Sequence, residues 1–207
     1  FAPGAYLVKL NQPYGRLAKT LLEKQTYPDP SLTTYDDSAW TMPLANNIDV
    51  KTIDEKDILK APGTLLTSDV VTGGTVAGTG PVLAVKHNGS LNLITLGYRL
   101  KDVAIKGAKA SFKANGTDFP AGSFLLPNSE RARKEIQAPG LQAAALGSQP
   151  DVVSTDVDLP RIAMYTTWAN TEKVGWVRLA FDRFEIPFVL IHKDHVQAGA
   201  NLRSKYD

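Results

Sequence analysis

The alternation of apolar and polar residues is most regular near the end of the chain, where it predicts a strand, a helix and a second strand. The strands are expected at Arg161–Tyr165 and Phe188–Ile191, and the helix at Thr171–Phe184. The apolar residues that recur at helical spacing are Val174, Val177, Phe181 and Phe184. Elements in this order are typical of a βαβ unit with two parallel strands and a right-handed crossover.

This βαβ unit is too small to bury both faces of its own sheet. Parallel sheets normally have both faces covered, and one helix can cover only one of them. We therefore expect residues 157–207 to be the opening of a larger, flavodoxin-like α/β domain, whose next strand would begin close to Tyr206. The free edge of the Phe188–Ile191 strand predicts pairing with the remainder of a larger protein or with a second copy.

Residues 61–156 combine short strands with two helices, a pattern that predicts an α+β accessory domain. The candidate strands are Thr64–Val71, Pro81–Val85, Ala110–Lys113 and Ser123–Leu126, and the candidate helices are Leu91–Leu100 and Ser129–Gln137. The Asn115-Gly116 pair predicts a hairpin turn between the third and fourth of these strands. Asp151–Pro160 is expected to be a linker, because it is polar and ends in proline.

Residues 1–60 predict an extended arm with one helix. A strand is expected at Tyr6–Leu10 and a helix at Tyr14–Gln25, before a long turn-rich passage at Tyr27–Asn47. Large apolar residues of this arm include Tyr14, Leu17, Leu21, Leu22 and Trp40. They offer more apolar surface than a short segment normally leaves in water, so we expect the arm to dock on another domain. The fold class of the whole chain is therefore α/β.

Composition excludes several classes of function. The chain has 207 residues, a formal net charge of +2 and no block of like charge, so we expect neither a nucleic-acid groove nor a strongly charged partner. It has no cysteine, which excludes disulfides, thiolate metal sites and a cysteine nucleophile. No apolar run approaches the length of a membrane span.

Few residues suggest catalysis or metal binding. His192 and His195 have ligand-like spacing, but a zinc site needs three or four protein ligands and only His87 remains. We interpret the pair as surface histidines after a strand. No G-x-S-x-G motif distinguishes a nucleophilic serine, and Asp36-Asp37 lies in a segment where carboxylates cap turns. We therefore predict no catalytic and no metal-ligating residue in this chain.

Glycine-rich and asparagine-rich segments are interpreted as turns and caps. The loop at residues 73–80 has four glycines but matches neither phosphate-binding motif, so we predict a flexible turn. The sequons Asn88-Gly89-Ser90 and Asn115-Gly116-Thr117 fit a helix cap and a hairpin turn. Asn128 or Ser129 is expected to cap the helix that Pro139-Gly140 ends.

One loop is better placed to bind a ligand. In open α/β sheets ligands bind beyond the carboxyl ends of the strands. The loop after the first strand of the βαβ unit occupies that position, and its candidate residues are Thr166, Thr167, Trp168 and Asn170. Hydroxyl groups, an indole and a helix N-terminus are suited to a polar ligand or an anion. Packing of Trp168 against a neighbouring domain explains the same residues equally well.

Several segments together resemble a known family. YLVKLNQPYGRLAKTLL at residues 6–22 and YDDSAW at residues 35–40 resemble the stretch after the catalytic domain of large bacterial zinc carboxypeptidase-like proteins of the carboxypeptidase A type. FPAGSF at residues 119–124 and DLPRIAMY at residues 158–165 resemble the regions that come next there. GWVR at residues 175–178 and FEIPF at residues 184–188 resemble the start of their class I glutamine-amidotransferase-like domain.

The resemblance implies a non-catalytic accessory region. In that family the catalytic domain has an H-x-x-E zinc motif, but none of His87, His192 and His195 is followed by a glutamate at the required position. The resemblance thus places zinc in the catalytic domain of a parent hydrolase and no cofactor in this chain. It implies an extracellular or periplasmic location, and as partners the catalytic peptidase domain, the remainder of the parent chain or a second copy. The alternative is a non-enzymatic module that binds a peptide or carbohydrate through the 166–170 loop.

Overall fold

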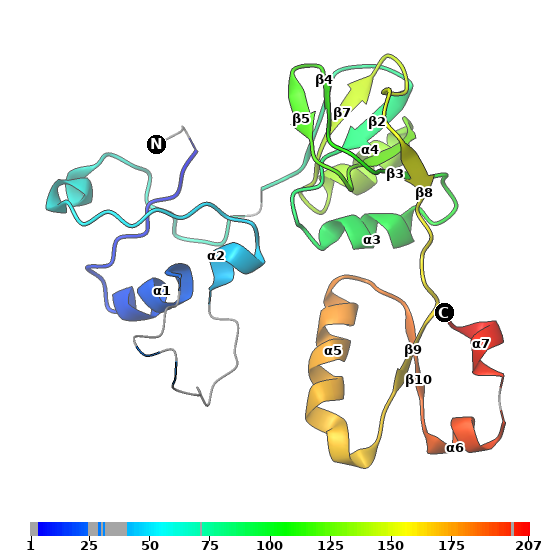
Figure 1. Ribbon diagram of the computed structural model, residues 1–207. Coiled ribbons are helices and arrows are strands. Elements are labelled where there is room, and N and C mark those ends of the chain that lie inside the picture. Colours follow the sequence, from blue (N-terminus) through cyan, green and yellow to red (C-terminus); the bar gives the residue numbers. More distant parts are fainter. Residues whose placement is uncertain (1–3, 25–28, 30, 32–40, 71, 200) are drawn as a thin grey trace. The chain divides into compact units, whose positions relative to one another are not determined.

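The chain forms two compact units, residues 1–70 and 71–207. The computed structural model describes residues 4–24, 29, 31, 41–70, 72–199 and 201–207 (Figure 1). Together they give a mixed α/β protein, as the sequence predicts. The strands and helices predicted for residues 157–207 belong to the same compact unit as the six-stranded sheet.

The first unit consists of short helices joined by extended segments. Its helices are α1 (Gly15–Leu22), α2 (Met42–Ala45) and the 3₁₀ helix η1 (Lys56–Lys60). The predicted helix Tyr14–Gln25 is therefore present but shorter, because the chain turns to an extended conformation at Glu23. Among the described residues of this unit the only buried ones are Gly15 and Pro43.

Two strands predicted from sequence are wrong. Tyr6–Leu10 and the described part of Thr64–Val71 form no strand, and the apolar side chains in both segments are exposed. A strand needs a hydrogen-bonded neighbour, and an alternating pattern alone does not supply one. Trp40 and Asp36-Asp37 lie outside the described residues.

The second unit is built on a six-stranded mixed sheet with the order β1-β7-β2-β6-β3-β8. Its strands are β1 (Thr75–Ala77), β2 (Val82–Val85), β3 (Lys106–Ala108), β6 (Phe124–Pro127), β7 (Gln142–Leu146) and β8 (Ser154–Asp156). The β1–β7 pair is parallel, and every other neighbouring pair is antiparallel.

Different elements cover the two faces of this sheet. Helices α3 (Asn92–Arg99) and α4 (Glu130–Gln137) pack on one face. The core on that side includes Leu83, Val85, Leu93, Leu96, Leu100, Leu126, Ile136 and Ala145. The hairpin of β4 (Phe112–Ala114) and β5 (Thr117–Phe119) covers the other face, where Phe119 packs with Ala84, Leu125, Ala144 and Leu146. The result is a three-layered domain in which the sheet lies between helices and a hairpin (Figure 1).

The hairpin has a different second strand from the predicted one. Asn115 and Gly116 form the turn with positive φ of 49° and 74°, the conformation that this pair favours. The strand after the turn is Thr117–Phe119, because Phe119 stacks on Phe112 with ring centroids 5.0 Å apart. The predicted partner Ser123–Leu126 instead contributes to β6, inside the main sheet.

Two segments predicted to be irregular form edge strands. The glycine-rich loop 73–80 contains β1, and the predicted linker Asp151–Pro160 contains β8. A Cβ atom on Gly74 would lie 2.3 Å from the carbonyl oxygen of Leu141, and one on Gly80 would lie 2.1 Å from that of Leu146. The glycines therefore permit close approach of two backbones, which is a different role from a flexible turn.

The cap predicted for α4 is present, whereas the cap predicted for α3 is not. The Ser129 hydroxyl accepts a hydrogen bond from the Ala132 amide at 3.1 Å at the start of α4. Before α3 the Ser90 hydroxyl accepts a hydrogen bond from the Asn92 amide at 3.2 Å, but the N-cap residue of this helix is Leu91, which has no side-chain cap. Gly140, with a φ of 81°, follows the end of α4. Asn88, Ser90 and Asn115 thus take part in turns, and the Asn115 side chain also donates a hydrogen bond to the Ala145 carbonyl oxygen of β7 at 3.1 Å.

Residues 159–207 form the predicted strand–helix–strand unit. Strands β9 (Ile162–Tyr165) and β10 (Phe188–Ile191) pair in parallel, and α5 (Thr171–Arg183) connects them after the short 3₁₀ helix η2 (Trp168–Asn170). Helices α6 (Lys193–Gln197) and α7 (Leu202–Lys205) follow. The sheet of β9 and β10 has only these two strands, so each has an unpaired edge among the described residues.

Candidate functional site

The predicted ligand loop lies at the carboxyl end of β9. Its first residue extends the strand pairing, because the Thr166 amide donates a hydrogen bond to the Ile191 carbonyl oxygen at 3.0 Å. Thr166 and Thr167 are half-buried, whereas the Trp168 side chain is 97% exposed. Asn170 ends η2, next to the first turn of α5. The loop therefore presents one indole to the surface, and its two threonines lie closer to the strand ends.

Both histidines of the H-x-x-H pair leave the same end of the sheet as this loop. His192 follows β10, whose last residue Ile191 pairs with Tyr165 at the end of β9. The His192 amide donates a hydrogen bond to Nδ1 of His195 at 3.2 Å, and the two side chains form a capping box for α6. Both are exposed, and His195 Nδ1 is occupied by this cap. This arrangement fits surface histidines after a strand.

The third histidine is in a different environment. His87 follows β2, its amide donates to the Ser123 hydroxyl at 3.1 Å, and its ring lies against Gly122. Among the residues that the structure describes, no three His, Cys, Asp or Glu side chains are grouped so that they could hold a metal ion.

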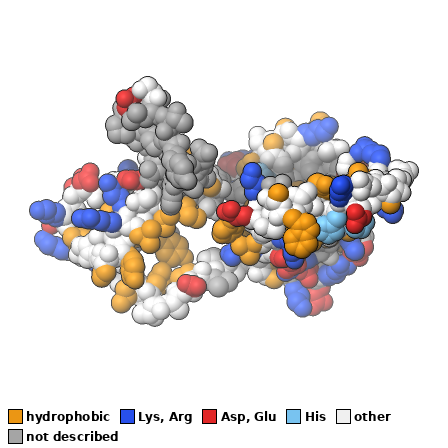
Figure 2. Space-filling view, turned by 90° about the horizontal axis from the view of Figure 1, so that it is seen from below, with side chains coloured by type: hydrophobic (Ala, Val, Ile, Leu, Met, Phe, Trp, Pro, Cys, Tyr) orange, Lys and Arg blue, Asp and Glu red, His pale blue; other side chains and the backbone are white. Residues whose placement is uncertain are grey.

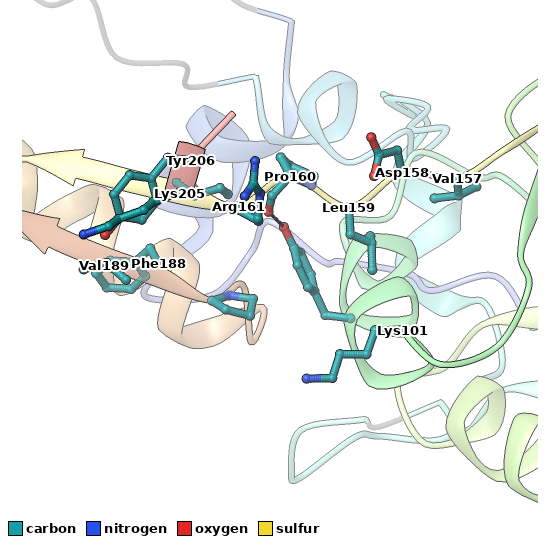
Figure 3. A pocket seen from close by; sticks show the side chains of 13 residues that line it. Lys101, Val157, Asp158, Leu159, Pro160, Arg161, Phe188, Val189, Lys205 and Tyr206 are labelled. Carbon is teal, nitrogen blue, oxygen red and sulfur yellow. Dashed lines mark hydrogen bonds between the residues drawn. The ribbon is translucent and has the colours of Figure 1, made fainter. Parts of the chain in front are cut away.

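A cavity of about 610 Å³ lies at the opposite, amino end of β9 and β10. It is lined by residues from the end of α3, the segment before β9, the start of β10 and the end of α7 (Figure 3). Figure 3 shows Lys101 on the α3 side, and Lys205 and Tyr206 on the side of β9 and β10. The Tyr98 hydroxyl donates a hydrogen bond to the Pro160 carbonyl oxygen at 2.9 Å and so joins α3 to the segment before β9.

Arg161 lines this cavity and forms an extensive polar contact with Asp207, which follows the lining residue Tyr206. The Arg161 guanidinium donates to both carboxylate oxygens of Asp207, at 2.8 and 3.2 Å, and to the Ser204 carbonyl oxygen at 2.9 Å. The Asp207 amide donates to the Arg161 carbonyl oxygen at 3.0 Å. These hydrogen bonds from Arg161 lower the pKa of Asp207 to about 2, because they stabilise its charged form.

The cavity is lined by charged and phenolic groups as well as apolar side chains. Arg161 is paired with Asp207, and burial raises the pKa of Tyr98 above its usual value, so the phenol keeps its proton near neutral pH. The remaining charged groups of the lining are Lys101, Asp158 and Lys205. Serine, threonine and histidine are absent from the described lining.

A second polar contact joins α3 to the turn between α5 and β10. Arg99 donates from Nε to Glu185 at 2.7 Å and from one terminal nitrogen to Glu135 at 3.0 Å. The hydrogen bond from Arg99 lowers the pKa of Glu185. The Thr95 hydroxyl donates to the Phe184 carbonyl oxygen at 2.7 Å. These contacts attach the βαβ unit to the domain formed by the six-stranded sheet.

The sequence does not reveal the cavity or these contacts. Arg161 and Asp207 are 46 residues apart, and Arg99 and Glu185 are 86 apart. No local motif marks either pair, so only the fold brings them together. The loop at 166–170 could be found because it follows a strand directly.

Comparisons with known proteins give no relative. No protein-family model, no curated protein and no solved structure matches this chain. Among the described residues, no helix has the length and apolar character needed to cross a membrane.

Proposed function

We propose that this chain is a non-catalytic accessory region of a secreted zinc carboxypeptidase-like hydrolase. In this role it packs against the catalytic domain and shapes substrate access or assembly. The proposal rests on the order of the sequence segments that resemble the family, and the βαβ unit supplies the structural observation that supports it. None of the 13 residues of α5 is buried.

The βαβ unit leaves apolar surface open on both sides. Phe181 of α5 lies against Phe188 of β10, with ring centroids 5.5 Å apart, so α5 covers the face of the sheet that carries Phe188. Strand alternation places Tyr165 and Val189 on the other face, where they are 51% and 48% exposed. Figure 2 shows hydrophobic side chains at the surface among charged groups of both signs. Exposed apolar surface of this extent is typical of proteins that pack against a partner.

The backbone at the start of β9 indicates how such packing would extend the sheet. Asp207 donates its amide hydrogen to the carbonyl oxygen of Arg161, and Arg161 donates its own amide hydrogen to the Asp207 carboxylate at 2.9 Å. The chain at residue 207 therefore lies beside the free edge of β9. A strand added there would satisfy backbone groups that are otherwise open to water.

The catalytic zinc of such a hydrolase would be held outside the described residues of this chain, which offer no group of ligands for it. We propose that the parent protein is bacterial and acts in an extracellular or periplasmic location. Its partners within that protein are the catalytic peptidase domain and the sequence that completes the amidotransferase-like domain.

A ligand-binding module is the second candidate, and one observation favours it. Trp168 is almost fully exposed beside Thr166 and Thr167 at the carboxyl end of β9, where an indole can stack on a sugar ring or a peptide side chain. Titration with oligosaccharides and peptides, monitored by tryptophan fluorescence, tests this alternative. Trp168→Ala should remove a response that Trp176→Ala leaves in place.

The accessory function is tested by the gene and by the activity of the protein that it encodes. We expect the reading frame around this sequence to encode an H-x-x-E zinc motif upstream of Phe1. Deletion of residues 1–207 should change KM for C-terminal peptide substrates more than kcat. A reading frame without a peptidase motif, or peptidase activity in the isolated 207-residue chain, would contradict the proposal.

A further inference from the structure

Four residues form a stripe along one face of α5, and this stripe is complementary to an identical stripe that runs in the opposite direction. Its four residues are Glu172, Trp176, Leu179 and Arg183, at successive spacings of four, three and four. This is the spacing of the a and d positions that form the seam of a coiled coil. Val174 and Phe181 lie on the opposite side of the helix, and Phe181 contacts Phe188 of the sheet. The stripe therefore faces away from the sheet that α5 covers.

All four residues of the stripe are exposed. Trp176 is 67% exposed and Leu179 is 58% exposed, although both are large apolar side chains. Glu172 and Arg183 form no ion pair with any residue that the structure describes. Two apolar residues between two unpaired charges of opposite sign are typical of a small helix–helix contact.

From this stripe we infer that α5 pairs with α5 of a second copy, in antiparallel orientation about a two-fold axis. An antiparallel pair centred between Val177 and Arg178 places Trp176 opposite Leu179 of the second copy. The same register places Glu172 opposite Arg183, and the two-fold axis repeats both contacts. One register thus satisfies both the apolar and the charged positions of the stripe.

The residues that flank the stripe are compatible with this register. In an antiparallel pair, equivalent flanking positions of the two helices face each other, so Lys173 lies near Ala180 and Gly175 near Asp182. Neither contact brings like charges together. Gly175 and Ala180 are small, and all four flanking residues are exposed, so the two helices can approach closely.

The size of the contact predicts a weak dimer. A helix of 13 residues is about 20 Å long, and interfaces that bury less than about 1,200 Å² in total are generally weak. The dimer should therefore form at high protein concentration and dissociate on dilution. This inference does not depend on the proposed function, because it uses only the residues of α5.

Reversal of charge tests the register directly. Sedimentation velocity over a range of concentrations should show a mass that rises from 22.4 kDa toward twice that value. Glu172→Arg or Arg183→Glu places like charges opposite each other and should weaken dimerisation about tenfold or more. The double variant Glu172→Arg/Arg183→Glu restores opposite charges and should return the dissociation constant to near that of the wild type.

Arg178→Glu is the matched control, since Arg178 is exposed on α5 but lies outside the stripe. It makes the same change of charge as Arg183→Glu and should leave dimerisation close to that of the wild type. Circular dichroism checks that each variant is folded. A wild-type chain that stays monomeric at every concentration would overturn the inference. The same conclusion follows if the double variant dimerises no better than the single ones, or if Arg178→Glu weakens the dimer equally.

Discussion

Residues 71–156 and residues 157–207 both join strands to helices, yet they differ in what covers their sheets. The first region has helices on one face of its sheet and a hairpin on the other. Of the described hydrophobic side chains that form the buried core, it holds all except Ile191. The second region has one helix on a two-stranded sheet, and none of the residues of that helix is buried. A clear strand–helix–strand pattern therefore establishes the elements, whereas the number of layers determines how much apolar surface is buried.

This comparison predicts that the same substitution lowers the free energy of unfolding strongly in one helix and hardly at all in another. Leu96 of α3 is fully buried, so Leu96→Ala should lower the free energy of unfolding by about 2–5 kcal/mol through lost burial and a cavity. Leu179 of α5 is 58% exposed, so Leu179→Ala should change it by less than about 0.5 kcal/mol. Urea unfolding at a concentration where the chain is monomeric measures both. Similar losses for the two variants would show that α5 is covered in solution.

The two regions should also respond differently when a glycine is replaced by alanine. Gly80 has a φ of 147° and lies against the Leu146 backbone, so Gly80→Ala should destabilise the protein by about 1–3 kcal/mol. Gly175 lies in α5, and an added Cβ atom there would have no neighbour within 4 Å. Gly175→Ala should therefore stabilise the helix by about 0.5–1 kcal/mol. Thermal unfolding of both variants tests this, and a destabilised Gly175→Ala would indicate close packing around α5.

The helix cap in the first region should have a smaller effect. Ser129 accepts a hydrogen bond from the Ala132 amide at the start of α4, and Ser129→Ala should cost about 1 kcal/mol of stability. Ser129→Asp is the control, because aspartate caps a helix equally well. Urea unfolding that finds the two variants equally destabilised would show that the hydroxyl hydrogen bond is not the cause.

The contact between the two regions should respond weakly to pH. Arg99 lowers the pKa of Glu185, so the contribution of the pair is complete above the pKa of an unfolded glutamate and is lost as pH falls through the lower folded value. Glu185 is 49% exposed, and solvent screening limits the contribution to about 1 kcal/mol or less. Glu185→Gln should therefore be less stable than the wild type at pH 7, and this difference should shrink as the pH falls toward 3.

Glu55→Gln is the control for this prediction, because Glu55 is exposed and forms no ion pair with a described residue. Its stability should match that of the wild type at both pH values. A Glu185→Gln variant that follows the wild type from pH 7 to pH 3 would mean that the contact with Arg99 does not form in solution.

The sequence predicts where helices and strands lie along the chain better than it predicts which strands pair with each other. The bounds of β10 and the start of α5 were predicted correctly, because apolar positions there follow the strand and helix periods. The strand at Tyr6–Leu10 was wrong, since alternation does not show whether a partner strand exists. Strand β1 was missed because its glycines are typical of loops, although here they allow the backbone to approach β7.

The candidate site could be predicted only in part. Thr166, Thr167 and Trp168 were identified from their place after a strand, and the structure puts them at that end of the sheet. The cavity at the opposite end combines residues between Tyr98 and Tyr206, which no local pattern connects.

Hydrogen exchange tests most directly the claim that residues 157–207 form an incompletely covered sheet. At low protein concentration, peptides from β2, β6 and β7 should be the most protected, because these central strands open only when the domain unfolds. Peptides from β9 and β10 should exchange at least about tenfold faster, through opening of the βαβ unit alone. Equal protection of the two sheets would contradict the account, because it would mean that β9 and β10 are already covered on both faces.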